Sequence, residues 1–149
     1  MVERESATPI VIRKGRIVAV DSAPIIYFLQ DHPRFANRFA PIFIAADAGA
    51  VEIIISAITV AEVLSGPIAL GQEAVVARYR EALTAKAHWH VIPVDVAIAE
   101  DAARLRTRYN LRLPDALQVA TALRAGADTL VTHDRRLKRI PELTVIGLT

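Results

Sequence analysis

The chain has 149 residues, of which 53% are hydrophobic and 23% are charged, and it contains no cysteine. This length is close to that of one domain and is sufficient for a stable core, and the apolar content excludes a disordered protein. Its apolar runs are shorter than the roughly 20 residues of a membrane span. Without cysteine, disulfides, thiolate zinc sites and a cysteine nucleophile are excluded, and without a signal-peptide pattern we expect a cytoplasmic protein with no membrane association.

The formal net charge is only +2, but the charge is unevenly distributed. Residues 1–100 hold 9 Lys and Arg against 11 Asp and Glu, whereas residues 101–149 hold 9 against 5. The C-terminal third is therefore basic, which fits either a solvated helix surface or a phosphate-binding face. Its basic side chains are Arg104, Arg106, Arg108, Arg112, Arg124, Arg135, Arg136, Lys138 and Arg139.

Short apolar runs rich in β-branched residues alternate with longer amphipathic runs along the chain. Strands are predicted over residues 17–20, 51–55, 89–94, 129–131 and 143–146. Helices are predicted over residues 24–30, 34–48, 59–64, 72–86, 96–108, 114–124 and 134–139, with a break or kink at Gly66–Pro67. This alternation predicts one α/β domain over residues 17–149, in which helices flank a central, mainly parallel five-stranded sheet.

Residues 1–16 precede the first predicted strand and form an N-terminal extension. Within it, Pro9 to Ile12 is apolar and is separated from Arg16 to Val20 by Lys14–Gly15. This pattern predicts a possible extra strand, paired with the first strand as an antiparallel edge hairpin.

Four acidic residues occupy informative positions. Asp21 and Asp134 follow predicted strands, Glu62 lies one turn into the helix after residues 51–55, and Asp115 opens a helix. Each also has an ordinary structural role as a helix cap or first-turn acid, and Thr59 and Glu62 together have the spacing of a capping box.

In an open parallel sheet, ligands bind beyond the carboxyl ends of the strands, so the four acids are expected to meet in one crevice. Carboxylates a few ångströms apart repel one another, which favours either proton uptake or a bound cation. All-oxygen ligands suit Mg²⁺ or Mn²⁺, which leave positions for phosphate oxygens. The pattern therefore indicates a metal-dependent phosphodiesterase, with one or two ions equally compatible.

Four segments together resemble the motifs of PIN-domain ribonucleases, most closely the VapC-like toxins of toxin–antitoxin pairs. The similarity extends over residues 17–146, in matching order and spacing. The four segments are Val20–Ala23, Ser56–Glu62, Leu113–Ala122 and Leu130–Asp134.

The resemblance implies an endoribonuclease that holds Mg²⁺ or Mn²⁺ with four acids, with nearby hydroxyl groups in support, and the basic C-terminal third supplies candidate substrate-binding residues. The resemblance also implies a homodimer inhibited by a small antitoxin, whose arginine pairs with the acids. The acids are Asp21, Glu62, Asp115 and Asp134, the hydroxyl groups those of Ser22 and Thr132, and the candidate substrate-binding residues Arg112, His133, Arg135 and Arg136.

Rival interpretations have less support. His88 and His90 lie on one face of a predicted strand, but without an obvious third ligand a zinc site is disfavoured. His133 beside Asp134 is either a phosphate contact or an ordinary loop histidine. The alternative function is a catalytically silent PIN-like module that binds RNA or protein, and Mg²⁺-dependent cleavage would separate the two.

Overall fold

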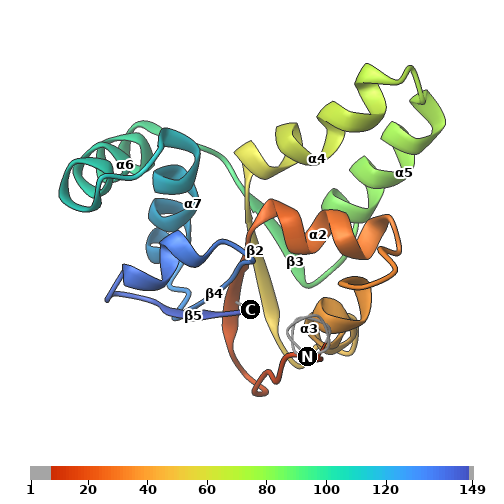
Figure 1. The fold of residues 1–149 in the computed structure, drawn as a ribbon, viewed down its shortest axis with the longest axis horizontal. Coiled ribbons are helices and arrows are strands. Elements are labelled where there is room, and N and C mark those ends of the chain that lie inside the picture. Colours follow the sequence, from red (N-terminus) through yellow and green to blue (C-terminus); the bar gives the residue numbers. More distant parts are fainter. Residues whose placement is uncertain (1–7, 148–149) are drawn as a thin grey trace.

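The computed structural model describes residues 8–147 (Figure 1). Its strands are β1 (Ile17–Val20), β2 (Glu52–Ser56), β3 (Trp89–Ile92), β4 (Thr129–Val131) and β5 (Thr144–Ile146). Its helices are α2 (Ser22–Leu29), α3 (Ala36–Asp47), α4 (Ala57–Ala69), α5 (Glu73–Thr84), α6 (Val96–Tyr109), α7 (Leu113–Arg124) and the short 3₁₀ helix η1 (Arg135–Arg139). The predicted alternation of strands and helices is confirmed.

The five strands form one parallel sheet in the order β3-β2-β1-β4-β5. The chain leaves β1, builds β2 and β3 on one side, and then returns to place β4 on the other side of β1. The strand order therefore reverses between β1 and β4, and a crevice is expected beyond the carboxyl ends of these two strands. Asp21 follows β1 directly, and Thr132 follows β4.

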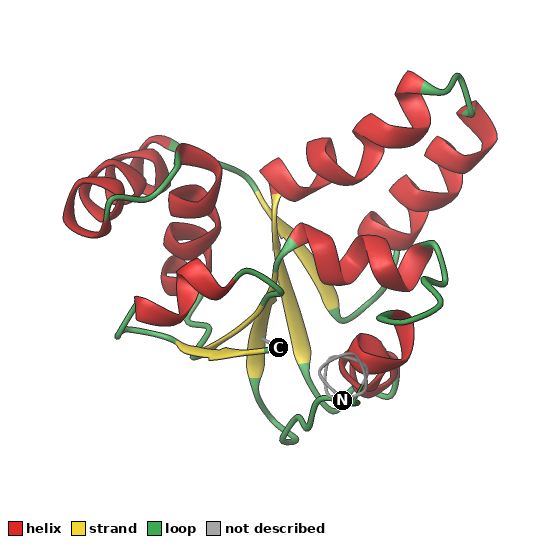
Figure 2. Ribbon diagram, viewed as in Figure 1, coloured by secondary structure: helices red, strands yellow, loops and turns green. Residues whose placement is uncertain are grey.

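Alternate side chains of the sheet enter two separate cores, one on each face. Val18, Ile53 and Val131 pack with α2 to α5, whereas Ala19 and Leu130 pack with α6, α7 and η1. In Figure 2 the two helical layers lie on opposite sides of the yellow strands. Both faces of the sheet are thus buried, as parallel sheets require, which leaves the strand ends as the natural place for a site.

The predicted N-terminal hairpin is wrong for the residues that the structure describes. Residues 9–12 have no strand conformation, although Ile10 is buried and donates its backbone N–H to the Arg38 carbonyl at 2.9 Å. The physical reason is that β1 is a central strand. Because β2 and β4 occupy both of its hydrogen-bonding edges, no edge is left for an antiparallel partner.

Of the predicted break or kink at Gly66–Pro67, the break is wrong, because α4 continues to Ala69. Pro67 is buried within the helix, and packing of α4 against α5 offsets the hydrogen bond that proline cannot donate. The same helix begins earlier than expected, at Ala57, and its cap is Ser56, whose Oγ accepts from the Ile58 N–H at 3.3 Å. Thr59 therefore lies inside the helix, and the predicted capping box does not form.

Two apolar runs, residues 25–29 and 42–44, could serve as a docking strip or as core, and the structure places most of them in the core. Ile25, Ile42 and Phe43 are fully buried, and only Ile44 of this group faces solvent, with 65% of its surface exposed. Within residues 8–147, no helix has the length and apolar character needed to cross a bilayer.

Candidate functional site

A cleft of about 370 Å³ lies at the switch point between β1 and β4. Its lining contains all four acids singled out in the sequence, together with three of the four candidate substrate-binding residues. The lining residues are Asp21, Ser22, Ala23, Tyr27, Glu62, Arg112, Asp115, His133, Asp134 and Arg135. Of the remaining expected residues, Thr132 is buried beneath Asp21, and Arg136 reaches the acids from η1.

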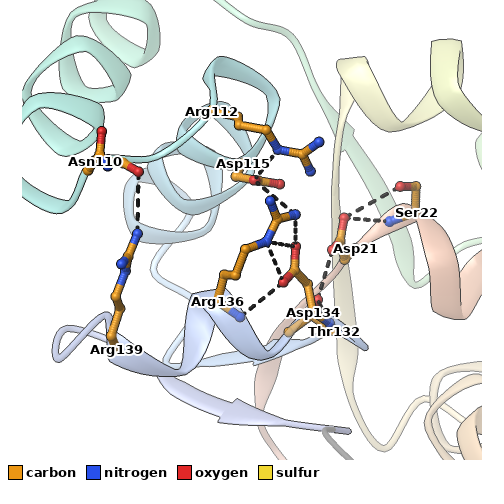
Figure 3. Close-up of polar contacts among 9 residues, drawn as sticks. All are labelled: Asp21, Ser22, Asn110, Arg112, Asp115, Thr132, Asp134, Arg136 and Arg139. Carbon is orange, nitrogen blue, oxygen red and sulfur yellow. Dashed lines mark hydrogen bonds and ion pairs between the residues drawn. The ribbon is translucent and has the colours of Figure 1, made fainter.

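Asp21 is both the N-cap of α2 and a desolvated acid of the cleft. Its Oδ1 accepts from the Ser22 backbone N–H at 2.8 Å, and its Oδ2 accepts from the Thr132 hydroxyl at 2.8 Å (Figure 3). Burial of the carboxylate is the main cause that raises its pKa, and the charges of Asp115 and Asp134 raise it further. The predicted capping role and the proximity to other acids thus coexist in one side chain.

Glu62 stands at the rim of the cleft on α4. The residue as a whole is exposed, but its carboxylate faces the cleft, where partial burial and then the charge of Asp21 raise its pKa. The buried Gln118 on α7 donates its amide N–H to Thr59 Oγ1 at 2.6 Å and to Glu62 Oε1 at 3.4 Å. Thr59, expected to be a helix cap, instead accepts this hydrogen bond inside the core.

Asp115 and Asp134 are held by two arginines. Arg112 Nε donates to Asp115 Oδ2 at 3.2 Å, and Arg136 makes a two-pronged contact with Asp134 through Nε (2.9 Å to Oδ1) and Nη2 (2.5 Å to Oδ2). Arg136 Nη2 also lies 3.8 Å from Asp115 Oδ2, so it bridges the two acids (Figure 3). The Arg136 guanidinium lowers the pKa of Asp134, which additionally caps η1 through the Arg136 backbone N–H.

His133 lies on the α2 side of the same cleft. Its Nδ1 is 3.1 Å from the hydroxyl of Tyr27, and the Phe35 ring approaches it edge-on at 4.6 Å between centroids. Burial is the main cause that lowers its pKa, and the positive charges of Arg38 and Arg135 add to that effect. Burial also raises the pKa of the Tyr27 phenol. Both side chains are therefore neutral polar groups at neutral pH.

The donor set of the cleft fits a hard divalent cation. It offers carboxylate oxygens from four residues, and the raised pKa of Asp21 and of Glu62 indicates negative charge that a cation would relieve. Within residues 8–147, no three His, Asp or Glu side chains are already grouped around one point as a metal cage. Asp115 and Asp134 would have to exchange part of their arginine contacts for the ion.

His88 and His90 lie at the opposite end of the sheet from the cleft. His88 Nδ1 is 2.9 Å from Glu52 Oε1, and His90 Nε2 is 2.6 Å from Glu52 Oε2. Nothing in the sequence groups Glu52 with these histidines, but its carboxylate contacts both imidazoles. The three groups form a partly exposed polar cluster at the surface.

Two residues near the cleft were missed in the sequence. Gln118 has no distinguishing position in the sequence pattern of α7. Only its burial, with 5% of its surface exposed, shows that its amide must have hydrogen-bond partners inside the protein. Tyr27 lies in an apolar run of α2, and nothing in the sequence indicates that its hydroxyl contacts His133. No local signal identified either residue, because both partners come from distant segments.

A family model of the PIN domain matches residues 18–143, which is most of the chain. The protein therefore belongs to the PIN-domain family, and the resemblance carried by the four motifs is confirmed. A comparison with curated protein sequences found no match.

Several solved structures share this fold. A chain of a toxin–antitoxin complex from Klebsiella pneumoniae is 30% identical, with a TM-score of 0.65 and coverage of 87% of this chain and 95% of that chain. VapBC2 from Rickettsia felis, bound to a fragment of its promoter DNA, is 23% identical, with a TM-score of 0.69 and coverage of 87% and 97%. VapC20 from Mycobacterium tuberculosis, a toxin that cleaves the sarcin–ricin loop, is 11% identical, with a TM-score of 0.62 and coverage of 76% and 86%.

Proposed function

We propose that this protein is a divalent-metal-dependent endoribonuclease and the toxin of a toxin–antitoxin pair. The observation that carries the proposal is the gathering of Asp21, Glu62, Asp115 and Asp134 in one cleft, where burial raises the pKa of Asp21 and of Glu62. Membership of the PIN-domain family and a 30% identical chain in a toxin–antitoxin complex support it.

The acids have distinct roles in this proposal. Asp21 and Asp115 are direct ligands of one or two Mg²⁺ or Mn²⁺ ions, Glu62 holds a second ion or accepts a proton, and Asp134 completes the set. When bound, such an ion lowers the pKa of water and neutralises charge that develops on phosphate oxygens. Thr132 and the Ser22 backbone N–H fix the orientation of the Asp21 carboxylate by donating to it.

Substrate binding is assigned to the basic and polar residues around the acids. Arg112 and Arg136 are held close to the acids by ion pairs, so they are placed to contact the phosphate on either side of the cut. Arg135 and His133 line the cleft and would contact the RNA backbone or a base. Such contacts would make binding strongly dependent on salt concentration.

The direct test is cleavage of a single-stranded RNA by purified protein, with Mg²⁺, with Mn²⁺ and with a chelator. We expect cleavage only with a divalent ion, and a loss of roughly a hundredfold or more in Asp21→Asn and Asp115→Asn. Glu52→Gln, at the other end of the sheet, is the matched control and should retain activity. Near wild-type cleavage by either Asn variant would overturn the assignment.

One observation favours the alternative of a silent binding module. Arg136 and Arg112 already neutralise Asp134 and Asp115, so the site has internal cations at two of its four acids. In that case the protein would bind RNA with the same affinity with or without a divalent ion, and neither ion would produce cleavage.

A small antitoxin, a homodimer and a cytoplasmic location are part of the same proposal. The Arg112 and Arg136 contacts support the antitoxin, because they show that guanidinium groups fit these acids in this chain. Co-purification with the product of a neighbouring small reading frame, followed by inhibition of cleavage by that product, would test the partner. Light scattering of the free protein would test the dimer.

A further inference from the structure

Four rings from separate segments form a continuous, partly exposed cluster beside the acidic cleft. Tyr27 comes from α2, His32 and Phe35 from the connection between α2 and α3, and His133 from the segment after β4. Neighbouring ring centroids are 5.0 Å apart for Tyr27–His32, Tyr27–Phe35 and His32–Phe35, and 4.6 Å for Phe35–His133. We call this cluster the aromatic platform.

The platform rests on the core without being part of it. Phe39 is fully buried and lies 5.9 Å from both Tyr27 and His133 between ring centroids, whereas each of the four platform residues keeps part of its surface exposed. Aromatic side chains contribute most when they are buried, and a contiguous exposed group of them typically marks a binding surface.

Hydrogen bonds hold three of the rings in place. His32 Nδ1 accepts the backbone N–H groups of Arg34 and Phe35, both at 3.1 Å, and the Tyr27 hydroxyl contacts His133 Nδ1 at 3.1 Å. The rings are thus ordered before any ligand binds. Little side-chain entropy is lost when a flat ligand stacks on such a surface, because the partners are already immobile.

The platform and the acidic cleft share residues. Tyr27 and His133 line the cleft together with Asp21 and Asp134, so a ligand that fills the cleft lies against both the acids and these two rings. Positive charge borders the rings, since the Arg34 guanidinium lies 5.2 Å from the centre of the Phe35 ring and Arg135 lines the same cleft. Flat rings beside cations suit a polyanion that carries aromatic bases better than they suit an apolar peptide.

We propose that Tyr27, His32, Phe35 and His133 form a stacking site for an unpaired nucleobase of the RNA, next to the phosphodiester held at the acids. The inference rests on the proposed function for the identity of the nucleic acid. Stacking on aromatic faces tolerates every base, so this site selects for single-stranded RNA over paired RNA and contributes little sequence preference.

The test is binding of a short labelled oligoribonucleotide in the presence of a chelator, so that no cleavage occurs. Phe35→Leu keeps an apolar side chain and removes the aromatic face. Phe28→Leu is the matched control, because Phe28 is a partly buried aromatic that stacks on Phe43 at 4.3 Å and does not line the cleft. We expect Phe35→Leu to bind roughly tenfold more weakly and Phe28→Leu to bind like the wild type.

A second measurement keeps the test valid even if Phe35→Leu fails to fold. Replacing nucleotides of the oligomer one at a time with abasic residues should weaken binding to the wild type by a similar factor at one position. At that position the abasic change should have little further effect in Phe35→Leu, since the same interaction is removed twice. Equal affinity of the wild type for every abasic oligomer would overturn the platform.

Failure of the platform and failure of the proposed function give different results. Base-dependent binding without metal-dependent cleavage would support the platform and contradict the nuclease. If the protein cleaves RNA and Phe35→Leu binds RNA as tightly as the wild type, the nuclease would be supported and the platform contradicted. Loss of antitoxin binding in Phe35→Leu with unchanged RNA binding would assign this surface to protein docking and would also overturn the platform.

Discussion

Two acids at the carboxyl ends of the parallel sheet, Asp21 and Glu62, differ electrostatically from two acids at its amino ends, Glu52 and Asp128. At the amino ends of the strands, Glu52 contacts His88 and His90, and Asp128 contacts Arg16 at 2.5 Å. Hydrogen bonds from His90 and His88 lower the pKa of Glu52. Hydrogen bonds from Thr129 and Arg16 lower the pKa of Asp128. At the carboxyl ends, burial and neighbouring carboxylates raise the pKa of Asp21 and of Glu62.

This difference separates Glu52 and Asp128, which serve the fold, from Asp21 and Glu62, which are available for chemistry. Asp115 and Asp134 combine both conditions, because they line the cleft and also pair with its arginines. An exposed acid with a cationic partner is satisfied in the folded protein, so its charge needs nothing further. An acid that is desolvated among other acids is destabilised by its own charge, and it persists where a ligand can compensate that charge. The topology of the sheet separates the two groups, since it directs the helix starts and the switch point to one end only.

The largest expected effect is the difference in RNA cleavage between the variants Glu62→Gln and Glu52→Gln. Both changes replace a carboxylate with an amide of the same shape, but only Glu62 lines the cleft. Cleavage of RNA should fall by roughly a hundredfold or more in Glu62→Gln, because a charge facing the metal and the transition state is lost. The initial cleavage rate of Glu52→Gln should stay within about twofold of the wild-type rate. Equal losses in both variants would contradict the difference between the two ends of the sheet.

Thermal unfolding with added Mg²⁺ or Mn²⁺ tests the same contrast without any substrate. An ion that binds only the folded state stabilises the wild type by about 2.7 kcal/mol at a hundred times its dissociation constant. We expect Glu52→Gln to gain the same increment and Asp21→Asn to gain almost none. A metal-induced rise in the melting temperature of Asp21→Asn equal to that of the wild type would remove Asp21 from the ligand set.

Unfolding of the metal-free protein as a function of pH should show opposite signs at the two ends. Asp21 has a folded-state pKa above its ordinary value of 3.8, so the folded state holds the proton more tightly. Its contribution is most favourable below 3.8 and is lost as the pH rises through the raised pKa. Asp21→Asn should therefore be more stable than the wild type at neutral pH, and its free energy of unfolding should depend less on pH in this range.

Glu52 should behave in the reverse manner, because its folded-state pKa lies below its ordinary value of 4.5. Its stabilising contribution is present above 4.5 and is lost as the pH falls through the lowered pKa. Glu52→Gln should thus be slightly less stable than the wild type at neutral pH. Denaturant unfolding curves at pH 4 to 8 measure both variants, and stabilisation by Glu52→Gln at pH 7 would contradict the comparison.

Gln118→Leu has the smallest expected effect and sharpens the account of how Glu62 is held. Removing the amide leaves Glu62 without its donor from α7, which should lower the cleavage rate roughly fivefold, or about 1 kcal/mol. Thr59→Val is the matched control, because it removes the other partner of Gln118 and leaves the Glu62 contact in place. A larger loss of cleavage in Thr59→Val than in Gln118→Leu would show that core packing, and not the position of Glu62, limits the rate.

The fold was predictable because its signals are local. Runs of β-branched residues, amphipathic periodicity and Gly or Pro boundaries depend only on neighbours in the chain, so the five strands and the parallel α/β class followed from the sequence. Errors arose where tertiary contacts decided the outcome. Residues 9–12 find both edges of β1 occupied, and packing of α4 against α5 carries the helix through Pro67.

The candidate site divides in the same way. The sequence by itself determined which acids follow strands and helix starts, and a parallel sheet was enough to expect Asp21, Glu62, Asp115 and Asp134 at one end. Only the tertiary structure decided that Gln118 reaches Glu62 and that rings from α2, the following turn and the segment after β4 meet beside the cleft. Such contacts join residues up to 106 positions apart, and no local preference of the chain encodes them.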